Sequence, residues 1–378
     1  IPTLAGLAVV FTPGILTRFP KRKWVLGTCK FLYYLFIFVL LTALPSVITD
    51  SNGRLIGMTV LLFFANVCNV FATAGYAAWH IRFMPEHVRS YYLSFSLFFG
   101  AFISGVLVLA SGVVSDLLAD MAEKQLAFIV ILRYVAFLLG LLDVICLMIP
   151  HEVDYPLIKQ PKFTDIVSIP LRNRKFMMTM VVVFGFQFAE SIYNSSLTFY
   201  LLNTIHVSYA FYNFIIFAYS VFFIAFMSFW RKKIDQTSWF GVFSVGMIIV
   251  GPLQILYGFI RPGIACIVIL LLVRLPQHFA GVGHNTAFAN FQYINMPDNN
   301  RTCYSSFYQI VLQVAALLGT SFATFFHKFA KEWSFTLFDY TYEGGMPWLL
   351  FMSGTIELLL ALYISVFKKH LEPDALPQ

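Results

Sequence analysis

Three polar side chains interrupt the otherwise apolar stretch 175–202 at helical spacing. Gln187, Glu190 and Asn194 stand at positions i, i+3 and i+7, and Tyr193 lies beside them. This spacing places the side chains on one face of an α-helix. A carboxylate in an apolar environment is costly unless it is protonated, hydrated or paired with a cation. Glu190 therefore indicates either proton exchange or a counter-charge elsewhere in the chain.

A second apolar stretch, 263–290, carries the candidate counter-charge, Arg274. Its polar face and the flanks of that face comprise Arg274, Gln277, His278, Gly281, His284 and Asn285. Two histidines six positions apart do not share a helix face well, so this pattern does not predict a metal site. A structural ion pair between Glu190 and Arg274 explains the carboxylate as well as proton exchange does.

A third stripe lies in the stretch 55–80. Asn66, Asn69 and Thr73 repeat the i, i+3, i+7 spacing, and Tyr76 continues the same face. In lipid, such a face must turn toward protein or water. It either lines a polar cavity or forms hydrogen bonds that hold neighbouring helices together.

The elements that position these stripes are membrane-spanning helices. The chain is 59% hydrophobic and only 11% charged, with a mean hydropathy of +0.78, whereas soluble domains are ~25% charged. A span needs ~20 consecutive apolar residues, and no short alternating segments indicate a β-barrel. Eleven stretches qualify, at about 1–18, 24–46, 55–80, 90–115, 125–149, 175–202, 209–230, 238–259, 263–290, 304–326 and 346–367.

An internal repeat divides the chain into two similar halves. The segment that begins at Met84-Pro85 recurs at Met296-Pro297 with an offset of 212 residues, and Arg89 then corresponds to Arg301. Each copy lies on a short charged loop between two apolar stretches. Such a repeat indicates a duplicated architecture. We therefore expect an N-terminal half at 1–150, a linker at 151–174, a C-terminal half at 175–368 and a tail at 369–378.

The positive charge is distributed by loop rather than gathered into a nucleic-acid-binding patch. Eighteen of the 25 Lys and Arg residues fall on alternate connections and on the tail. By the positive-inside rule these connections are cytoplasmic. The C-terminus is then inside and residue 1 outside. Mapping the second half onto the first leaves one span upstream of residue 1, so we expect twelve spans in the intact protein.

The first basic loop carries a motif. Gly14, Leu16, Arg22 and Lys23 match a glycine followed by L-x-D-R-x-G-R-R, whereas Arg18 replaces the acid and Lys21 the second glycine. With two six-helix repeats around it, the chain resembles the major facilitator superfamily over its whole length. The resemblance implies an all-α membrane bundle of two pseudo-symmetric six-helix halves. The departures put the family's charge relay at this loop in doubt, and a positive-inside anchor explains the loop equally well.

The resemblance also implies a central cavity between the halves, lined by the first, fourth, seventh and tenth helices. Counting the absent helix, the last three are 55–80, 175–202 and 263–290, which are the stretches with polar stripes. The candidate cavity residues are Asn66, Asn69, Thr73, Tyr76, Gln187, Glu190, Tyr193, Asn194, Arg274, Gln277, His278 and Asn285. Residues assigned to cytoplasmic gating or topology are Gly14, Arg22, Lys23, Pro85, Arg89, Pro297 and Arg301.

The expected function is secondary transport of a small solute by alternating access, with Glu190 as the candidate proton carrier. We expect a plasma (inner) membrane location, a monomer, and the lipid bilayer and the solute as partners, with no nucleic acid. No cofactor, metal or enzyme is expected, because the sequence has no H-E-x-x-H, G-x-S-x-G or G-x-x-x-x-G-K-[ST] motif. The alternative is a membrane sensor or scaffold that keeps the fold and moves nothing.

Overall fold

A computed structural model describes residues 2–12, 19, 21–83, 86–152, 163–297, 301–337 and 339–372. The elements up to residue 148 are α1 (Pro2–Gly6), the 3-10 turn η1 (Leu7–Phe11), α3 (Lys23–Tyr34), the π-helical η2 (Leu35–Leu40), α4 (Leu41–Val47), α5 (Ser51–Phe83), α6 (Glu86–Leu117) and α7 (Ala122–Met148). The later elements are α8 (Phe163–Arg172), α9 (Arg174–Phe199), the π-helical η3 (Tyr200–Thr204), α10 (Tyr209–Gln236), α11 (Trp239–Tyr257), α12 (Ile264–Asn290), α13 (Arg301–Phe329), β1 (Ser334–Leu337), β2 (Tyr340–Glu343) and α14 (Met346–Leu371).

The helices are long and apolar enough to cross a membrane. Among the described residues, nine helical segments meet this criterion, and they coincide with nine of the eleven predicted spans. The predicted span 90–115 lies on α6, which has a shorter apolar part at 102–117. The predicted span 1–18 covers α1 and η1, and residues 13–18 lie outside the described part. The prediction of an all-α, multi-pass membrane protein is confirmed.

The chain forms two compact units. The first contains Ile1–Leu97 and Leu117–Lys162, and the second contains Phe98–Asp116 and Phe163–Gln378. The long helix α6 therefore contributes to both. The second boundary, near residue 162, lies within the stretch 151–174 that we predict to be a linker. Residues 153–162 of that stretch are outside the described part.

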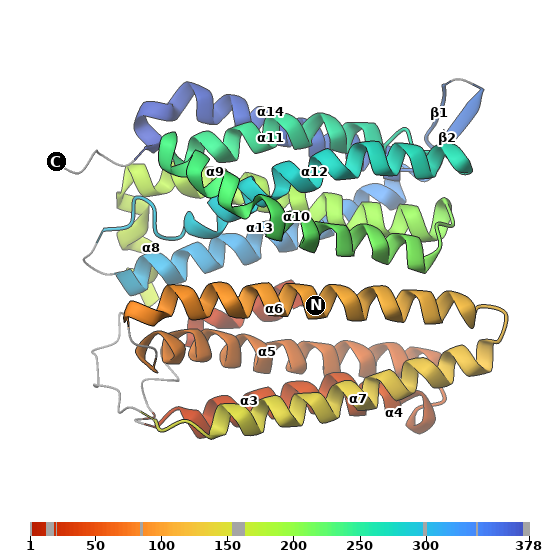
Figure 1. The fold of residues 1–378 in the computed structure, drawn as a ribbon, viewed down its shortest axis with the longest axis horizontal. Coiled ribbons are helices and arrows are strands. Elements are labelled where there is room, and N and C mark those ends of the chain that lie inside the picture. Colours follow the sequence, from red (N-terminus) through yellow and green to blue (C-terminus); the bar gives the residue numbers. More distant parts are fainter. Residues whose placement is uncertain are drawn as a thin grey trace. The chain divides into compact units, whose positions relative to one another are not determined.

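In the first unit, α3 packs against α5 and α7 (Figure 1). Lys30 of α3 forms an ion pair with Asp143 of α7 at 2.8 Å. Tyr34 donates a hydrogen bond to the same carboxylate at 2.7 Å. These contacts give a charged group on α7 the partners that a polar side chain needs within a membrane.

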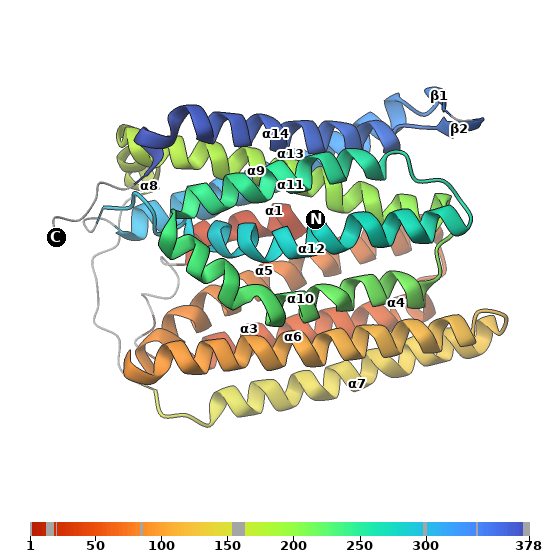
Figure 2. The ribbon, with the colours of Figure 1, turned by 45° about the horizontal axis from the view of Figure 1, so that its top comes forward.

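In the second unit, α9 packs against α13 and α14, and α11 packs against α12 and α14 (Figures 1 and 2). Side-chain caps begin three of the helices: Asn173 accepts from the Phe176 amide at 3.1 Å, and Ser208 and Ser238 cap α10 and α11. A cap supplies an acceptor for an amide that has no partner within its own helix. The antiparallel hairpin β1–β2 precedes α14, and Phe335 stacks on Tyr342 across it.

A buried polar network joins α9, α11 and α14. Gln254 of α11 donates to Oε1 of Glu357 on α14 at 2.7 Å. The hydroxyl of Ser353 lies 2.7 Å from Oε1 of Gln254 and 2.9 Å from the carbonyl oxygen of Ala189 on α9. All three polar side chains are 0% exposed. Within the described residues, Oε2 of Glu357 has no hydrogen-bond partner.

Two glycines allow the helices to come close enough for this network. A Cβ atom on Gly354 would lie 2.3 Å from the carbonyl oxygen of Gly251, and a Cβ on Gly251 would lie 2.9 Å from that of Gly354. Small residues at helix crossings let the backbones approach in this way within membranes. Gln254 and Glu357 each stand three positions beyond these glycines, so the close crossing brings their side chains together.

We predict that Gly354→Ala lowers the free energy of unfolding by about 1–3 kcal/mol, because the added methyl group overpacks the α11–α14 crossing. The measurement is denaturant unfolding of the purified protein in detergent. Gly100→Ala is the matched control, since a Cβ there meets nothing within 4 Å. Equal effects of the two substitutions would contradict the close crossing.

Glu357 gives a second test of the same crossing. Glu357→Gln keeps the side-chain volume and an acceptor for Gln254, so we expect wild-type stability. Glu357→Ala leaves a cavity and an unpaired buried amide, so we expect a loss of about 2–4 kcal/mol. Thermal unfolding of both variants measures the difference. If Gln were as damaging as Ala, the negative charge of Glu357 would be stabilising, and the network as described would be incomplete.

Candidate functional site

A polar cavity lies among four helices of the second unit. Its volume is about 230 Å³. Side chains of α9, α10, α11 and α12 line it: Glu190, Tyr193, Asn194, Ile216, Tyr219, Val250, Arg274, Gln277, His278, Gly281, His284 and Asn285. Seven of the twelve predicted cavity residues are among them. The two polar stripes of α9 and α12 therefore face a common space.

Arg274 is the cation of this cavity, and neutral polar groups from three helices hold it. Its Nη1 donates to Oε1 of Gln277 at 2.9 Å and to the hydroxyl of Tyr193. Tyr257 of α11 donates to the same Gln277 oxygen at 3.0 Å. The guanidinium also lies 5.9 Å from the ring centroids of both tyrosines, a favourable cation–π distance.

This arrangement restricts the position of the guanidinium. Tyr193 is 2% exposed and Gln277 is 8% exposed. Rotation of either side chain is therefore limited by its neighbours. Nε of Arg274 is a buried donor that has no partner within the described residues. A buried donor without an acceptor is costly.

Glu190 lies in the same cavity and is held differently. Asn194, one helical turn further along α9, donates to its Oε1 at 3.0 Å. In the described part of the chain no ion pair joins Glu190 to Arg274; the pairs found are Lys30–Asp143 and Lys368–Glu372. The two charges therefore line one cavity without direct contact.

The remaining polar lining comes from α10 and α12. Asn285 donates to the hydroxyl of Tyr219 at 3.2 Å. Nε2 of His278 lies 2.9 Å from the carbonyl oxygen of Ile215, and its ring packs against that of Tyr219. His284 packs edge-on against Phe186 and Phe243. Both histidines are buried, so they shape the wall of the cavity.

Five predicted residues lie elsewhere. Gln187 donates to Ser191 of its own helix at 3.3 Å and does not line the cavity. Asn66, Asn69, Thr73 and Tyr76 lie on α5, in the first unit. Thr73 donates to Asn69 at 3.4 Å, which shows that these two share a face. Their part in a cavity between the halves stays a prediction.

Of the residues assigned to gating or topology, Arg22 and Lys23 lie at the start of α3. The amides of Arg22 and Lys23 donate to the carboxylate of Glu152, and Nζ of Lys23 donates to the carbonyl oxygen of Pro150 at 2.7 Å. This ties the start of α3 to the end of α7. Gly14 and Pro85 lie outside the described residues. The side chains of Arg89 and Arg301 are also outside the described part. Pro297 precedes α13.

Tyr219 and Tyr257 complete the site, although the polar stripes alone do not assign them to it. Their contacts depend on which helices pair, and the spacing of residues along one helix carries no such information. Glu357 is different, because it is the single acidic residue in the stretch 346–367. A mid-span carboxylate was the signal that singled out Glu190, and it applies equally to Glu357.

Comparison with known proteins places the fold. No family model matches the sequence, and no curated protein matches it. Among solved structures, a POT family transporter in complex with 5-aminolevulinic acid has a TM-score of 0.67 at 13% identity, covering 98% of this chain and 87% of that one. The nucleoside transporter NupG has a TM-score of 0.59 at 14% identity, covering 97% and 89%.

A third solved structure is similar over the same length. It is FucP, the fucose:proton symporter of E. coli, described as a major facilitator superfamily transporter in the outward conformation. Its TM-score is 0.57 at 16% identity, and the match covers 97% of this chain and 86% of that one. The membrane-spanning helices and these similarities together show that the chain has the fold of a major facilitator superfamily transporter.

Proposed function

We propose that the protein is a secondary active transporter that moves a small polar solute across the membrane by alternating access. The observation that supports this most is the cavity of α9–α12. Its lining combines a carboxyl group, a guanidinium and amide groups on helices that are otherwise apolar. Polar and ionisable side chains within a membrane are energetically costly, and they are typical of a solute or ion pathway. Transporters of this architecture bind their solutes near the membrane midplane, between two helical bundles.

The lining favours a solute with both an acceptor and a donor group. Arg274 offers a buried Nε donor without a partner in the described residues. Glu190 and the amide oxygen of Asn194 are acceptors on the α9 wall. A carboxylate or phosphate on the solute would pair with Arg274, and an amine or hydroxyl with Glu190. The similar POT family structure holds 5-aminolevulinic acid, which carries a carboxylate and an amine.

Within this proposal, Glu190 carries the coupling proton. Its only hydrogen bond among the described residues comes from Asn194 on the same helix. The carboxyl group is therefore free to exchange a proton without disrupting contacts between helices. Arg274 lines the same cavity, so protonation of Glu190 changes the net charge that a solute meets there. FucP, one of the similar structures, is a proton symporter.

The first test identifies a solute. Purified protein is screened by thermal shift with fucose, uridine, a dialanine peptide and 5-aminolevulinic acid, and a solute that raises the unfolding midpoint is then radiolabelled. We expect Arg274→Lys to weaken its binding by about 10- to 100-fold, because a single ammonium replaces the multiple donors of the guanidinium. Arg231→Lys, an exposed change at the end of α10, is the control. Unchanged binding by Arg274→Lys would exclude Arg274 from the site.

The second test concerns coupling. In proteoliposomes we expect Glu190→Gln to abolish uptake driven by a pH gradient while counterflow of the same solute persists, because the amide cannot carry a proton. Glu332→Gln, an exposed change outside the cavity, should retain both activities. Persistent pH-driven uptake in Glu190→Gln would assign Glu190 a structural role. If the wild-type protein bound the solute yet showed no counterflow, the sensor or scaffold alternative would replace transport.

A further inference from the structure

A second and larger cavity lies beside α11 in the same unit. It is a groove of about 560 Å³ between α10 and α14, with α11 and α12 beneath it. Its lining comprises Phe229, Trp230, Lys233, Thr237, Gly241, Val242, Ser244, Val245, Ile249, Phe279, Ile364, Ser365 and Lys368. None of these residues lines the polar cavity described above, so the groove is a separate site.

The floor of the groove is firmly packed and its sides are open. Trp230 is 5% exposed and donates to the carbonyl oxygen of Phe279 at 2.8 Å, which ties α10 to α12. Val242 and Ile364 are also buried. On the sides, Phe229 and Val245 are 44% and 47% exposed. Because these helices span the membrane, the open apolar sides face lipid hydrocarbon.

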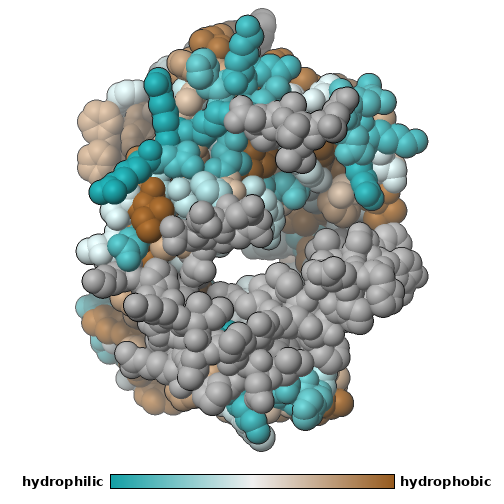
Figure 3. Space-filling view, turned by 90° about the vertical axis from the view of Figure 1, so that its left-hand side faces the viewer, coloured by the Kyte–Doolittle hydropathy of each residue, from teal (hydrophilic) through white to brown (hydrophobic). Residues whose placement is uncertain are grey.

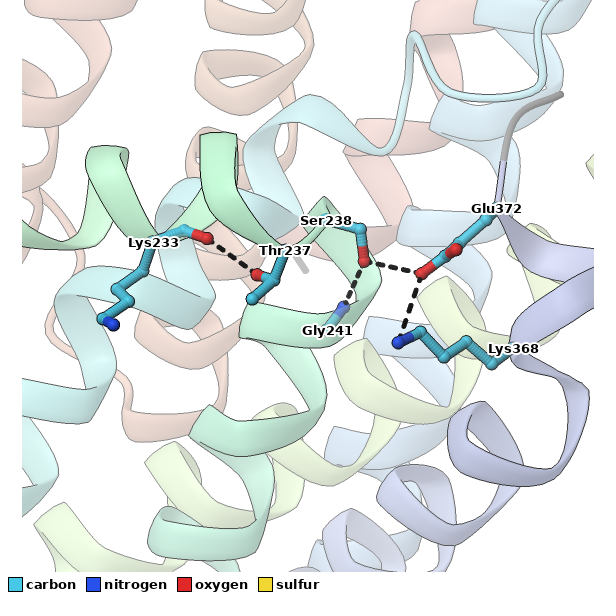
Figure 4. A network of polar contacts seen from close by, with 6 residues as sticks. All are labelled: Lys233, Thr237, Ser238, Gly241, Lys368 and Glu372. Carbon is cyan, nitrogen blue, oxygen red and sulfur yellow. Dashed lines mark hydrogen bonds and ion pairs between the residues drawn. The ribbon is translucent and has the colours of Figure 1, made fainter. Parts of the chain in front are cut away.

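One end of the groove is basic. Lys233 at the end of α10 and Lys368 at the end of α14 both line it, together with the hydroxyls of Thr237 and Ser365. Figure 4 shows the two lysines on either side of the turn that begins α11. In the upper part of Figure 3, which views this end of the helices, hydrophilic side chains cover much of the surface.

Protein carboxylates neutralise this end only in part. The partly buried Glu372 lies 3.8 Å from the exposed Lys368 and also accepts a hydrogen bond from Ser238 at 2.8 Å (Figure 4). Ion pairs at a protein surface are weak. Nζ of Lys233 lies 6.0 Å from the Phe229 ring centroid, and no carboxylate pairs with it among the described residues. The two lysine ammonium groups at this end of the apolar groove therefore have one carboxylate partner between them among the described residues.

We propose that this groove binds one anionic glycerophospholipid. An acyl chain lies against Val242, Val245 and Ile249, and the phosphate lies between Lys233 and Lys368. A lipid supplies both parts that the groove requires, a hydrocarbon chain and an adjacent negative charge. Basic pockets between membrane helices bind anionic headgroups in this way. A zwitterionic lipid has the same phosphate but no net charge, because its headgroup also carries a cation that the two lysines repel.

The test is lipid binding by the full chain, measured by native mass spectrometry from detergent. The probes are palmitoyl-oleoyl phosphatidylglycerol and the phosphatidylcholine with the same chains. We expect the wild type to prefer phosphatidylglycerol for its first bound lipid by about 30-fold, given two lysines near the phosphate. Lys233→Gln with Lys368→Gln should remove this preference. The matched control, Lys232→Gln with Lys369→Gln, removes the same charge from exposed positions outside the groove and should keep it.

Two further measurements distinguish the contribution of the lipid's acyl chain from that of its headgroup. Val245→Trp fills the groove at a partly exposed position, and it should reduce binding of the first phosphatidylglycerol without changing any charge. Free glycerol phosphate at the same concentration should not compete. Equal binding of both lipids, equal loss in the control pair, or competition by glycerol phosphate would overturn the proposal. Because the readout is lipid binding, its outcome is independent of whether the protein transports a solute.

Discussion

The structure depends on one constraint: a polar group on a membrane helix must find a protein partner or face water. The second unit meets this constraint in two ways. Between α11 and α14, Gln254 forms hydrogen bonds with both Ser353 and Glu357, and all three side chains are buried. Among α9, α10 and α12, the polar groups instead surround a cavity. The first solution joins helices, whereas the second leaves polar atoms available to a ligand.

Helix α9 lies between these two polar regions and takes part in both. The carbonyl oxygen of Ala189 accepts from Ser353 on the α14 side, while the next residue, Glu190, lines the cavity. Three residues further on, Tyr193 bonds to Arg274 and Gln277 of α12. The hydrogen bond from Ser353 to Ala189 therefore holds α9 against α14. The position of α9 in turn places Glu190 and Tyr193 in the cavity.

Hydrophobic length and isolated polar residues are local signals, so the sequence predicts nine spans that coincide with helices of the described residues and seven residues that line one cavity. It could not distinguish Gln187 from Glu190, which lie on the same stripe, since the partner of Gln187 is Ser191 on its own helix. It did not assign Tyr257 to the site because that contact depends on the packing of α11 against α12. Glu357 carried a local signal and was recoverable. Its partner Gln254 is on another helix, and their contact depends on the close crossing of α11 and α14 at the two glycines, which the sequence does not reveal.

Arg274 and Glu190, the two charged residues of the cavity, differ in how many hydrogen bonds to other helices restrain them. The contacts of Arg274 run from α12 to Tyr193 on α9, and through Gln277 to Tyr257 on α11. The guanidinium can therefore change position only if these helices move or several buried hydrogen bonds break. Glu190 is bonded only to Asn194 on its own helix, within the described residues. A rotation of one side chain is enough to redirect its carboxyl group. The cavity thus combines a cation fixed by the helix packing with a carboxyl group that can respond to a proton or a solute without rearranging that packing.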